Sequence, residues 1–196
     1  PYAGAVITTA HTADETPLGA IPVDTALLYA LAERVPLTPA RRDPEHSVEI
    51  ELPFLQRALP GAFSFVPLML RDQSPRAVQA LGEALAAVLG DAAGTLLVAS
   101  SDLSHFYPDA EARQLDAVML EQIATFDPAG VLRVEAAGHA YACGHGAIAA
   151  VLIAARRLGA EKVTVVGYGT SADTGGGASS VVGYGAAAIT RPVAQV

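Results

Sequence analysis

The sequence contains one cysteine, Cys143, and no run of arginine or lysine residues. A single cysteine excludes an intrachain disulfide and is typical of a reducing compartment, so we expect a cytoplasmic protein. The absence of a basic patch argues against a nucleic-acid partner. The longest apolar helical stretch, residues 147–155, is too short to cross a bilayer, so we expect no membrane association.

Several catalytic motifs are also missing. The sequence has no H-E-x-x-H, no pair of C-x-x-C motifs and no G-x-S-x-G, so zincin, zinc-ribbon and α/β-hydrolase assignments have no direct support. A glycine-rich segment at residues 167–180 follows an expected strand, and its backbone N–H groups could cradle an anion. It lacks a Walker lysine and a G-x-G-x-x-G turn, which favours an active-site lid or a simple connector over a nucleotide loop.

The composition of the chain is strongly apolar. Of its 196 residues, 52% are hydrophobic and 16% are charged, the net charge is −8 and the mean hydropathy is +0.37. These values favour a sheet that is buried on both faces. No linker or repeat divides the chain, so we expect one domain over residues 1–196. Because an expected strand begins at residue 5 with almost no lead-in, we also expect this domain to lack an N-terminal segment.

The order of the periodic segments predicts an α/β fold. Expected strands cover residues 5–9, 63–70, 95–99, 162–168 and 180–189. Expected helices cover residues 24–34, 46–59, 74–89, 111–125 and 146–158, with a short helix after Asp127, and expected loops cover 14–19 and 36–44. Asp24 and Ser74 are expected N-caps. We therefore predict a three-layer-like sandwich with a mixed, largely parallel central sheet.

The first candidate site follows the expected strand 95–99, in the sequence SSDLSH that ends at His105. In open α/β sheets, reactions take place just outside the carboxyl ends of the strands, and Asp102 and His105 lie there three residues apart. This pair could orient an imidazole, bind a metal or move a proton. Alternatively, Asp102 caps the next turn and His105 is a surface histidine.

A second candidate lies in residues 45–53. If this segment is helical, His46 and Glu49 are i,i+3 neighbours that could hold a metal or orient the histidine through the carboxylate. Alternatively, the segment is an ordinary capped helix start with solvated acids.

The third candidate is Cys143, with the glycine-flanked His145, at the start of an apolar helix. A thiol near a helix N-terminus has a lowered pKa and binds soft metals well. The alternative is a small, buried, apolar cysteine. His139, four residues earlier, is more typical of a loop.

Taken together and in this order, these segments resemble the Memo-like family, whose prokaryotic members are called AmmeMemoRadiSam system protein B. The resemblance covers nearly the whole chain. Its motifs are ETPLG at 15–19 with PVD at 22–24, EHSVE at 45–49 with LPFLQ at 52–56, SSDLSH at 100–105, CGHGAI at 143–148 and SSVVGY at 179–184.

The resemblance implies a fold similar to the class III extradiol dioxygenases, which use non-haem Fe(II). It implies that Asp102, His105 and Cys143 are site residues, with Cys143 a metal ligand and His105 a ligand or a pocket acid/base. Members of the family are associated with iron or copper, with redox activity and with peptide binding. Two further metal histidines of the family lie in upstream segments like P-H-A-G-Y and G-P-S-H. His11 replaces neither of them, so we expect an incomplete metal site in this chain.

We therefore predict a metal-dependent redox enzyme with a dioxygenase-like pocket that holds Fe(II) or copper and takes a small-molecule or peptide ligand. Asp102 and His105 are its predicted catalytic residues, and Cys143 and His105 are its predicted metal ligands. Its predicted pocket residues are His46, Glu49, Ser101 and His145. One alternative is a peptide- or anion-binding module that uses the same pocket without turnover. The other is a metal-free hydrolase with Cys143 as nucleophile and His105 or His145 as base.

Overall fold

The structure is a computed structural model that describes residues 4–90 and 94–192. The chain divides into two compact units, residues 1–73 and 74–196. The described residues form a mixed α/β structure with six α-helices and three small sheets. None of these helices combines the length and the apolar character needed to span a membrane.

The first unit contains a three-stranded sheet with the order β4-β1-β5. Strand β1 (Val6–Thr9) runs parallel to β4 (Leu37–Ala40) and antiparallel to β5 (Leu68–Leu70). The apolar side chains of Val6 and Ile7 are buried, so β1 is the core strand that its sequence predicts.

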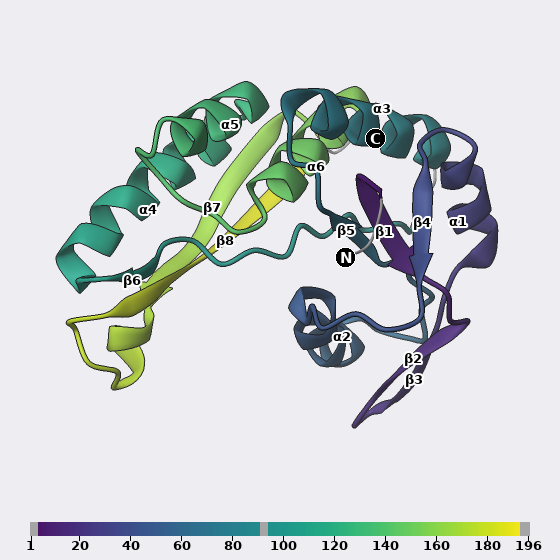
Figure 1. The fold of residues 1–196 in the computed structure, drawn as a ribbon, viewed down its shortest axis with the longest axis horizontal. Coiled ribbons are helices and arrows are strands. Elements are labelled where there is room, and N and C mark those ends of the chain that lie inside the picture. The colour runs from purple at the N-terminus through teal and green to yellow at the C-terminus, as the bar shows by residue number, and fades with distance from the viewer. Residues whose placement is uncertain (1–3, 91–93, 193–196) are drawn as a thin grey trace. The chain divides into compact units, whose positions relative to one another are not determined.

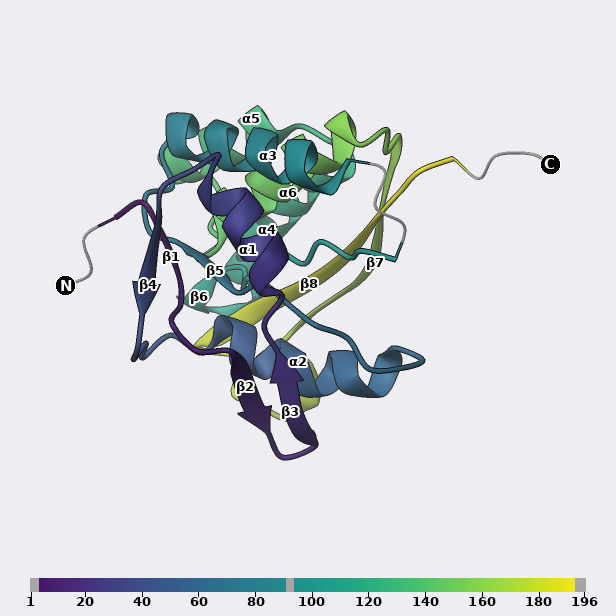
Figure 2. The same cartoon turned by 90° about the vertical axis from the view of Figure 1, so that its right-hand side faces the viewer.

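A hairpin and two helices complete the first unit. The hairpin joins β2 (Ala13–Thr16) to β3 (Gly19–Pro22) and lies beside α2 (Ser47–Ala58), as Figure 2 shows. The Thr16 hydroxyl donates to the Gln56 side-chain oxygen of α2 at 2.6 Å.

Helix α1 (Thr25–Ala32) begins at its expected N-cap. The Asp24 carboxylate accepts the Leu27 N–H at 2.9 Å, which satisfies one of the N–H groups left unpaired at a helix start. Helix α2 accommodates Pro53 in its interior, as expected for this segment.

The second unit is built around a long antiparallel pair, β7 (Lys162–Thr170) and β8 (Val181–Thr190), which is the green and yellow ribbon of Figure 1. Strand β6 (His105–Tyr107) adds to the other edge of β8, so the sheet order is β6-β8-β7. Helix α4 (Asp109–Ala124) packs on both β7 and β8. A short 3₁₀ helix, η1 (Ser171–Thr174), follows β7.

Three more helices gather on one side of the second unit. Helices α3 (Pro75–Leu89) and α5 (Pro128–Ala136) both pack against α6 (His145–Arg157). The N-cap of α3 is Ser74, whose hydroxyl accepts the Ala77 N–H at 3.4 Å, as predicted.

A β-bulge interrupts the pairing of β6 with β8. His105 pairs with Val182 and Tyr107 with Val181, so Phe106 has no partner in the register. Phe106 has a φ of 66°, a left-handed conformation that is uncommon for a bulky residue, and its side chain is exposed. The bulge lies directly beside the candidate residue His105.

The predicted α/β class is confirmed, but the described residues do not form a single, largely parallel central sheet. In the described residues the strands form three separate small sheets, in which the one parallel ladder joins β1 to β4. The other ladders are antiparallel. The segment expected as a loop at 36–44 contains β4, and the strand expected at 63–70 shortens to β5, with Phe65 in an isolated bridge to Val23.

The expected strand at 95–99 does not form. The side chains of Leu96 and Val98 are 62% and 47% exposed. An apolar run supplies the side chains of a core strand, but a strand also needs a neighbour for its backbone N–H and C=O groups. The sequence SSDLSH therefore follows an irregular segment, and its last residue begins β6.

Candidate functional site

The clearest candidate site joins Cys143 to Asp102 in the second unit. The Cys143 thiol accepts the backbone N–H of Asp102 at 3.3 Å and lies 3.6 Å from the Ser101 hydroxyl. In the other direction, the Cys143 N–H donates to the Asp102 carbonyl at 3.2 Å. Cys143 is exposed, so it is not the small buried cysteine of the alternative interpretation.

The start of α6 reinforces this contact. The Gly144 N–H donates to the Ser101 hydroxyl at 2.8 Å, and that hydroxyl donates to the Asp102 carbonyl at 2.7 Å. A methyl group at Gly144 would lie 2.7 Å from the Ser100 carbonyl oxygen, so the close approach requires a glycine. Ser101, a predicted pocket residue, therefore links the start of α6 to Asp102 through the two hydrogen bonds of its hydroxyl.

Asp102 also contacts His105. The Asp102 Oδ2 atom lies 3.4 Å from His105 Nε2, and the two side chains are 48% and 37% exposed. A pair this exposed contributes only about 0–1 kcal/mol to stability, so orientation of the imidazole is its more important effect. The predicted contact between the two residues is thus present.

His145 is held by two groups at the start of α6. Its Nδ1 atom lies 3.0 Å from the Ala142 carbonyl oxygen and its Nε2 atom lies 3.6 Å from the Glu135 carboxylate of α5. Because a carbonyl only accepts, Nδ1 carries the proton of this contact. The Glu135 carboxylate lies near the second nitrogen, and it pairs with that nitrogen only when the ring carries a second proton. The sequence motif indicated His145 but did not indicate Glu135.

His46 and Glu49 belong to the first unit. His46 is the N-cap residue of α2 and is exposed, and Glu49 lies in the first turn of the helix. The N–H groups of Ser47 and His46 donate to Glu45, each at 2.9 Å, and these bonds lower the pKa of the Glu45 carboxyl. The segment is helical, as both interpretations assumed, but the His46 side chain makes no capping hydrogen bond. That His46 and Glu49 share a pocket with Cys143 stays a prediction.

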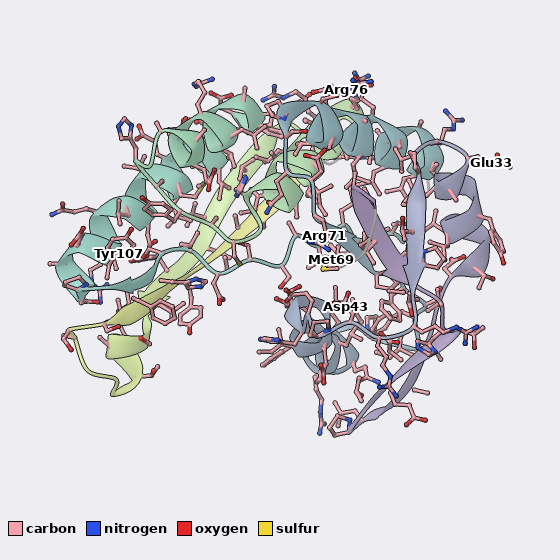
Figure 3. The ribbon with its side chains drawn as sticks, in the orientation of Figure 1. Glu33, Asp43, Met69, Arg71, Arg76 and Tyr107 are labelled. Atoms are coloured by element: carbon pink, nitrogen blue, oxygen red, sulfur yellow. The ribbon has the colours of Figure 1, made fainter. Side chains whose placement is uncertain are left out.

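Glu49 lines a cavity of about 340 Å³ within the first unit. Asp43, on the loop that leads into α2, and Met69, on β5, lie on its walls (Figure 3). The cavity is lined by apolar side chains, such as those of Ile7, Leu52 and Leu68, and by basic and acidic ones, with His11 and Arg41 among the basic. Its acidic lining residues are Asp14, Glu15, Asp43, Glu45 and Glu49.

The sequence of the chain matches a known protein family. The family model described as "Memo-like protein" matches residues 2–188. The chain belongs to the Memo-like family. The resemblance predicted from the motifs is thereby confirmed.

Three archaeal relatives support this membership of the Memo-like family. The chain is 36% identical over 175 residues to a "MEMO1 family protein" of Nitrosopumilus maritimus, which covers 88% of this chain and 63% of the relative. It is 32% identical over 191 residues to one of Methanopyrus kandleri, covering 95% and 68%, respectively. It is 36% identical over 174 residues to one of Sulfolobus acidocaldarius, covering 87% and 61%. The chain thus spans roughly two thirds of the length of these Memo-like relatives.

Within the part of this Memo-like chain that the structure describes, the donor atoms do not make a complete metal site. In the ranges 4–90 and 94–192, no group of three or more His, Cys, Asp or Glu side chains is placed to bind a metal ion. A mononuclear Fe(II) centre of the facial-triad type takes three protein ligands. Cys143 is a suitable single ligand, but these residues alone do not fit an iron centre.

The glycine-rich segment of the Memo-like chain is tied to α4. Arg113 contacts Asp109 at 2.9 Å and Asp173 of η1 at 2.7 Å. The Thr170 N–H and Arg113 lower the pKa of Asp173, and the hydrogen bond from Arg113 lowers the pKa of Asp109. These contacts favour the connector interpretation of residues 167–180 over the lid.

Sequence reasoning missed Asp116, a carboxylate buried under the candidate site. Asp116 accepts the backbone N–H of Ser104 at 2.8 Å and the Tyr168 hydroxyl at 2.8 Å. A signal was present, since Asp116 lies on the same face of α4 as the buried residues Ala112, Met119 and Ile123. An acid at a core position of an amphipathic helix needs a buried partner.

Proposed function

We propose that this Memo-like chain supplies a sulfur ligand and an acid–base pair to a metal-dependent redox site with a dioxygenase-like pocket. The proposal rests on the two hydrogen bonds between Cys143 and Asp102, from the Asp102 N–H to the sulfur and from the Cys143 N–H to the Asp102 carbonyl. The Asp102 carboxylate in turn contacts His105. These contacts bring together the three residues that the family resemblance implies are site residues.

The role of Cys143 is to bind a soft or borderline metal. Thiolate ligands suit iron and copper, and a bound metal would supply the redox chemistry. Because the described residues do not complete a centre, the proposal assigns one ligand, Cys143, to this chain's own cluster. The same proposal includes Fe(II) or copper as the metal and a small molecule or a peptide as the ligand. It also includes, as further metal ligands, the two histidines that the family resemblance implies.

Under this proposal, Asp102 positions the Cys143 sulfur, and Asp102 and His105 together move a proton. The Asp102 N–H donates to the Cys143 sulfur and fixes its position beside the Asp102 backbone. The Asp102 carboxylate orients the His105 ring, whose other nitrogen can then accept or donate a proton at a ligand.

An anaerobic titration with Co(II) tests the sulfur ligand, because cobalt–thiolate bonds absorb strongly in the near ultraviolet. We expect the wild-type chain to develop this absorption to saturation and Cys143→Ser to lose it. His139→Ala is the control, since His139 is an exposed histidine of the same unit. No absorption in the wild-type chain, or the same absorption in Cys143→Ser, would overturn the proposal and favour a metal-free binding module.

A further inference from the structure

Asp116 is a fully buried carboxylate with two neutral partners. Its exposed fraction is 0%, its Oδ1 atom accepts the Ser104 N–H and its Oδ2 atom accepts the Tyr168 hydroxyl. A buried carboxyl group is costly unless it is hydrogen-bonded, so the loss of one partner would leave one of its oxygens unsatisfied. Both bonds are therefore needed to keep this side chain where it is.

The backbone around Asp116 is built to admit it. A methyl group at Gly183 of β8 would overlap the Asp116 carboxylate. The same glycine pairs with the segment before His105, since the Leu103 N–H donates to the Gly183 carbonyl and the Gly183 N–H donates to the Ser104 carbonyl, each at 2.9 Å. The carboxylate thus lies where β8 and the site segment meet.

The residues that Asp116 contacts lie between the two residues of the candidate acid–base pair. Ser104 and Leu103 are buried, whereas Asp102 and His105, on either side of them, are partly exposed. The segment is therefore anchored from its buried side while its reactive side chains remain accessible. An anchor at Ser104 limits how far Asp102 and His105 can move apart.

We propose that Asp116 is a positioning residue, which fixes the backbone at Ser104 and thereby the contact between the Asp102 carboxylate and the His105 imidazole. The Tyr168 hydroxyl donates to the second carboxylate oxygen of Asp116. The inference rests on the proposed function in one respect, namely that Asp102 and His105 form the site.

The other groups near this anchor are consistent with that assignment. Burial, followed by the hydrogen bond to Asp116, raises the pKa of the Tyr168 hydroxyl, so it remains a proton donor. Arg113 lies 5.9 Å from the centre of the Tyr168 ring, but its guanidinium is engaged by Asp109 and Asp173. The position of the Asp116 carboxylate therefore depends on two neutral hydrogen-bond donors, the Ser104 N–H and the Tyr168 hydroxyl.

The test compares Asp116→Leu, Asp116→Asn and Tyr168→Phe in the metal-free chain at one fixed pH. Asparagine keeps an oxygen for the Ser104 N–H, leucine keeps only the approximate volume, and phenylalanine removes only the hydroxyl. Ile123→Ala is the matched control, because Ile123 is buried on the same face of α4. Thermal unfolding measures the stability of each variant, and the control must lose about as much stability as the Asp116 variants do.

The readout is the ¹⁵N resonance of His105 Nε2, with the exposed His139 as an internal reference. We expect Asp116→Leu to move the His105 resonance toward that of His139, Asp116→Asn to keep it near the wild-type position, and Ile123→Ala to leave it unchanged. If Asp116→Leu does not fold, Tyr168→Phe decides the question, and we expect a smaller movement in the same direction. An unmoved resonance in the folded variants, or an equal movement in Ile123→Ala, would overturn the inference.

A second measurement separates this inference from the proposed function. If the chain binds Co(II), we expect Asp116→Leu to weaken that binding and Asp116→Asn to restore it, because Asp116 anchors the segment whose Asp102 N–H contacts the Cys143 sulfur. The resonance of His105 is recorded without metal. A chain that binds no cobalt would therefore refute the sulfur ligand and still leave the role of Asp116 decided by the resonance.

Discussion

Ser101 and Gly144 share a hydrogen bond that closes the candidate site, in which the Gly144 N–H donates to the Ser101 hydroxyl at 2.8 Å. The same hydroxyl donates to the Asp102 carbonyl. A single side-chain oxygen therefore links the start of α6 to the segment that carries Asp102. Cys143, one residue before Gly144, is held beside Asp102 by this link and by its own two contacts.

Gly144→Ala should destabilise the second unit by about 1–3 kcal/mol, the usual cost of forcing an extra methyl group into a packed position. The added methyl group would lie 2.7 Å from the Ser100 carbonyl oxygen and 2.9 Å from the Ser101 Cβ atom. Urea unfolding measures the change. Gly177→Ala is the control, because a methyl group there meets nothing within 4 Å. Equal stability of the two variants would contradict the close approach.

Ser104→Ala should leave stability unchanged or raise it by about 1 kcal/mol, because the hydroxyl is buried and, among the described residues, has no hydrogen-bond partner. Ser101→Ala should instead lower stability by about 1 kcal/mol, since its hydroxyl makes two hydrogen bonds. The two variants remove the same atom, three residues apart. A clear loss of stability in Ser104→Ala would indicate that this hydroxyl has a partner, such as a buried water.

Stability should fall on acidification because of Asp109 and Asp173. The pKa of each is lower in the folded chain than the ordinary value of 3.8, so both favour folding above pH 3.8. This contribution is lost as the pH falls below 3.8 and through the folded pKa values. Urea unfolding between pH 6 and pH 2 should show a shallower decline in Arg113→Gln than in wild type. The same decline in both would show that Arg113 is not its cause.

Gly183→Ala should destabilise the chain by about 3 kcal/mol, because the new methyl group would overlap the buried Asp116 carboxylate. Gly167→Ala on the neighbouring strand β7 has open space and serves as the control. Adding Asp116→Ala to Gly183→Ala makes room, so the double variant should be more stable than the sum of the single effects predicts. Strict additivity would show that the two residues do not interact.

Local signals explain what the sequence predicted well. The starts of α1 and α3 follow from Asp24 and Ser74, because an N-cap acts within three residues of itself. The contact between Asp102 and His105 is similarly short in range, since the two residues are three positions apart. Such features depend little on the rest of the fold.

Long-range packing explains what the sequence alone did not predict. The run at 95–99 has the residues of a strand, but pairing depends on distant backbone, and the structure forms no strand there. The contact of Cys143 with Asp102 spans 41 positions, and only the family resemblance brought the two residues together before the structure did. Asp116 has its partners 12 and 52 positions away, which no local pattern records.

The bulge at Phe106 has a consequence for the two rings on either side of it. Residues paired across two strands share a face, and consecutive residues of a strand lie on opposite faces, so Val181 and Val182 point to opposite sides of β8. Their partners Tyr107 and His105 therefore do the same, although residues two apart in an unbroken strand would share a face. One extra residue thus separates the imidazole beside Asp102 from the phenol of Tyr107, which stacks on Tyr141.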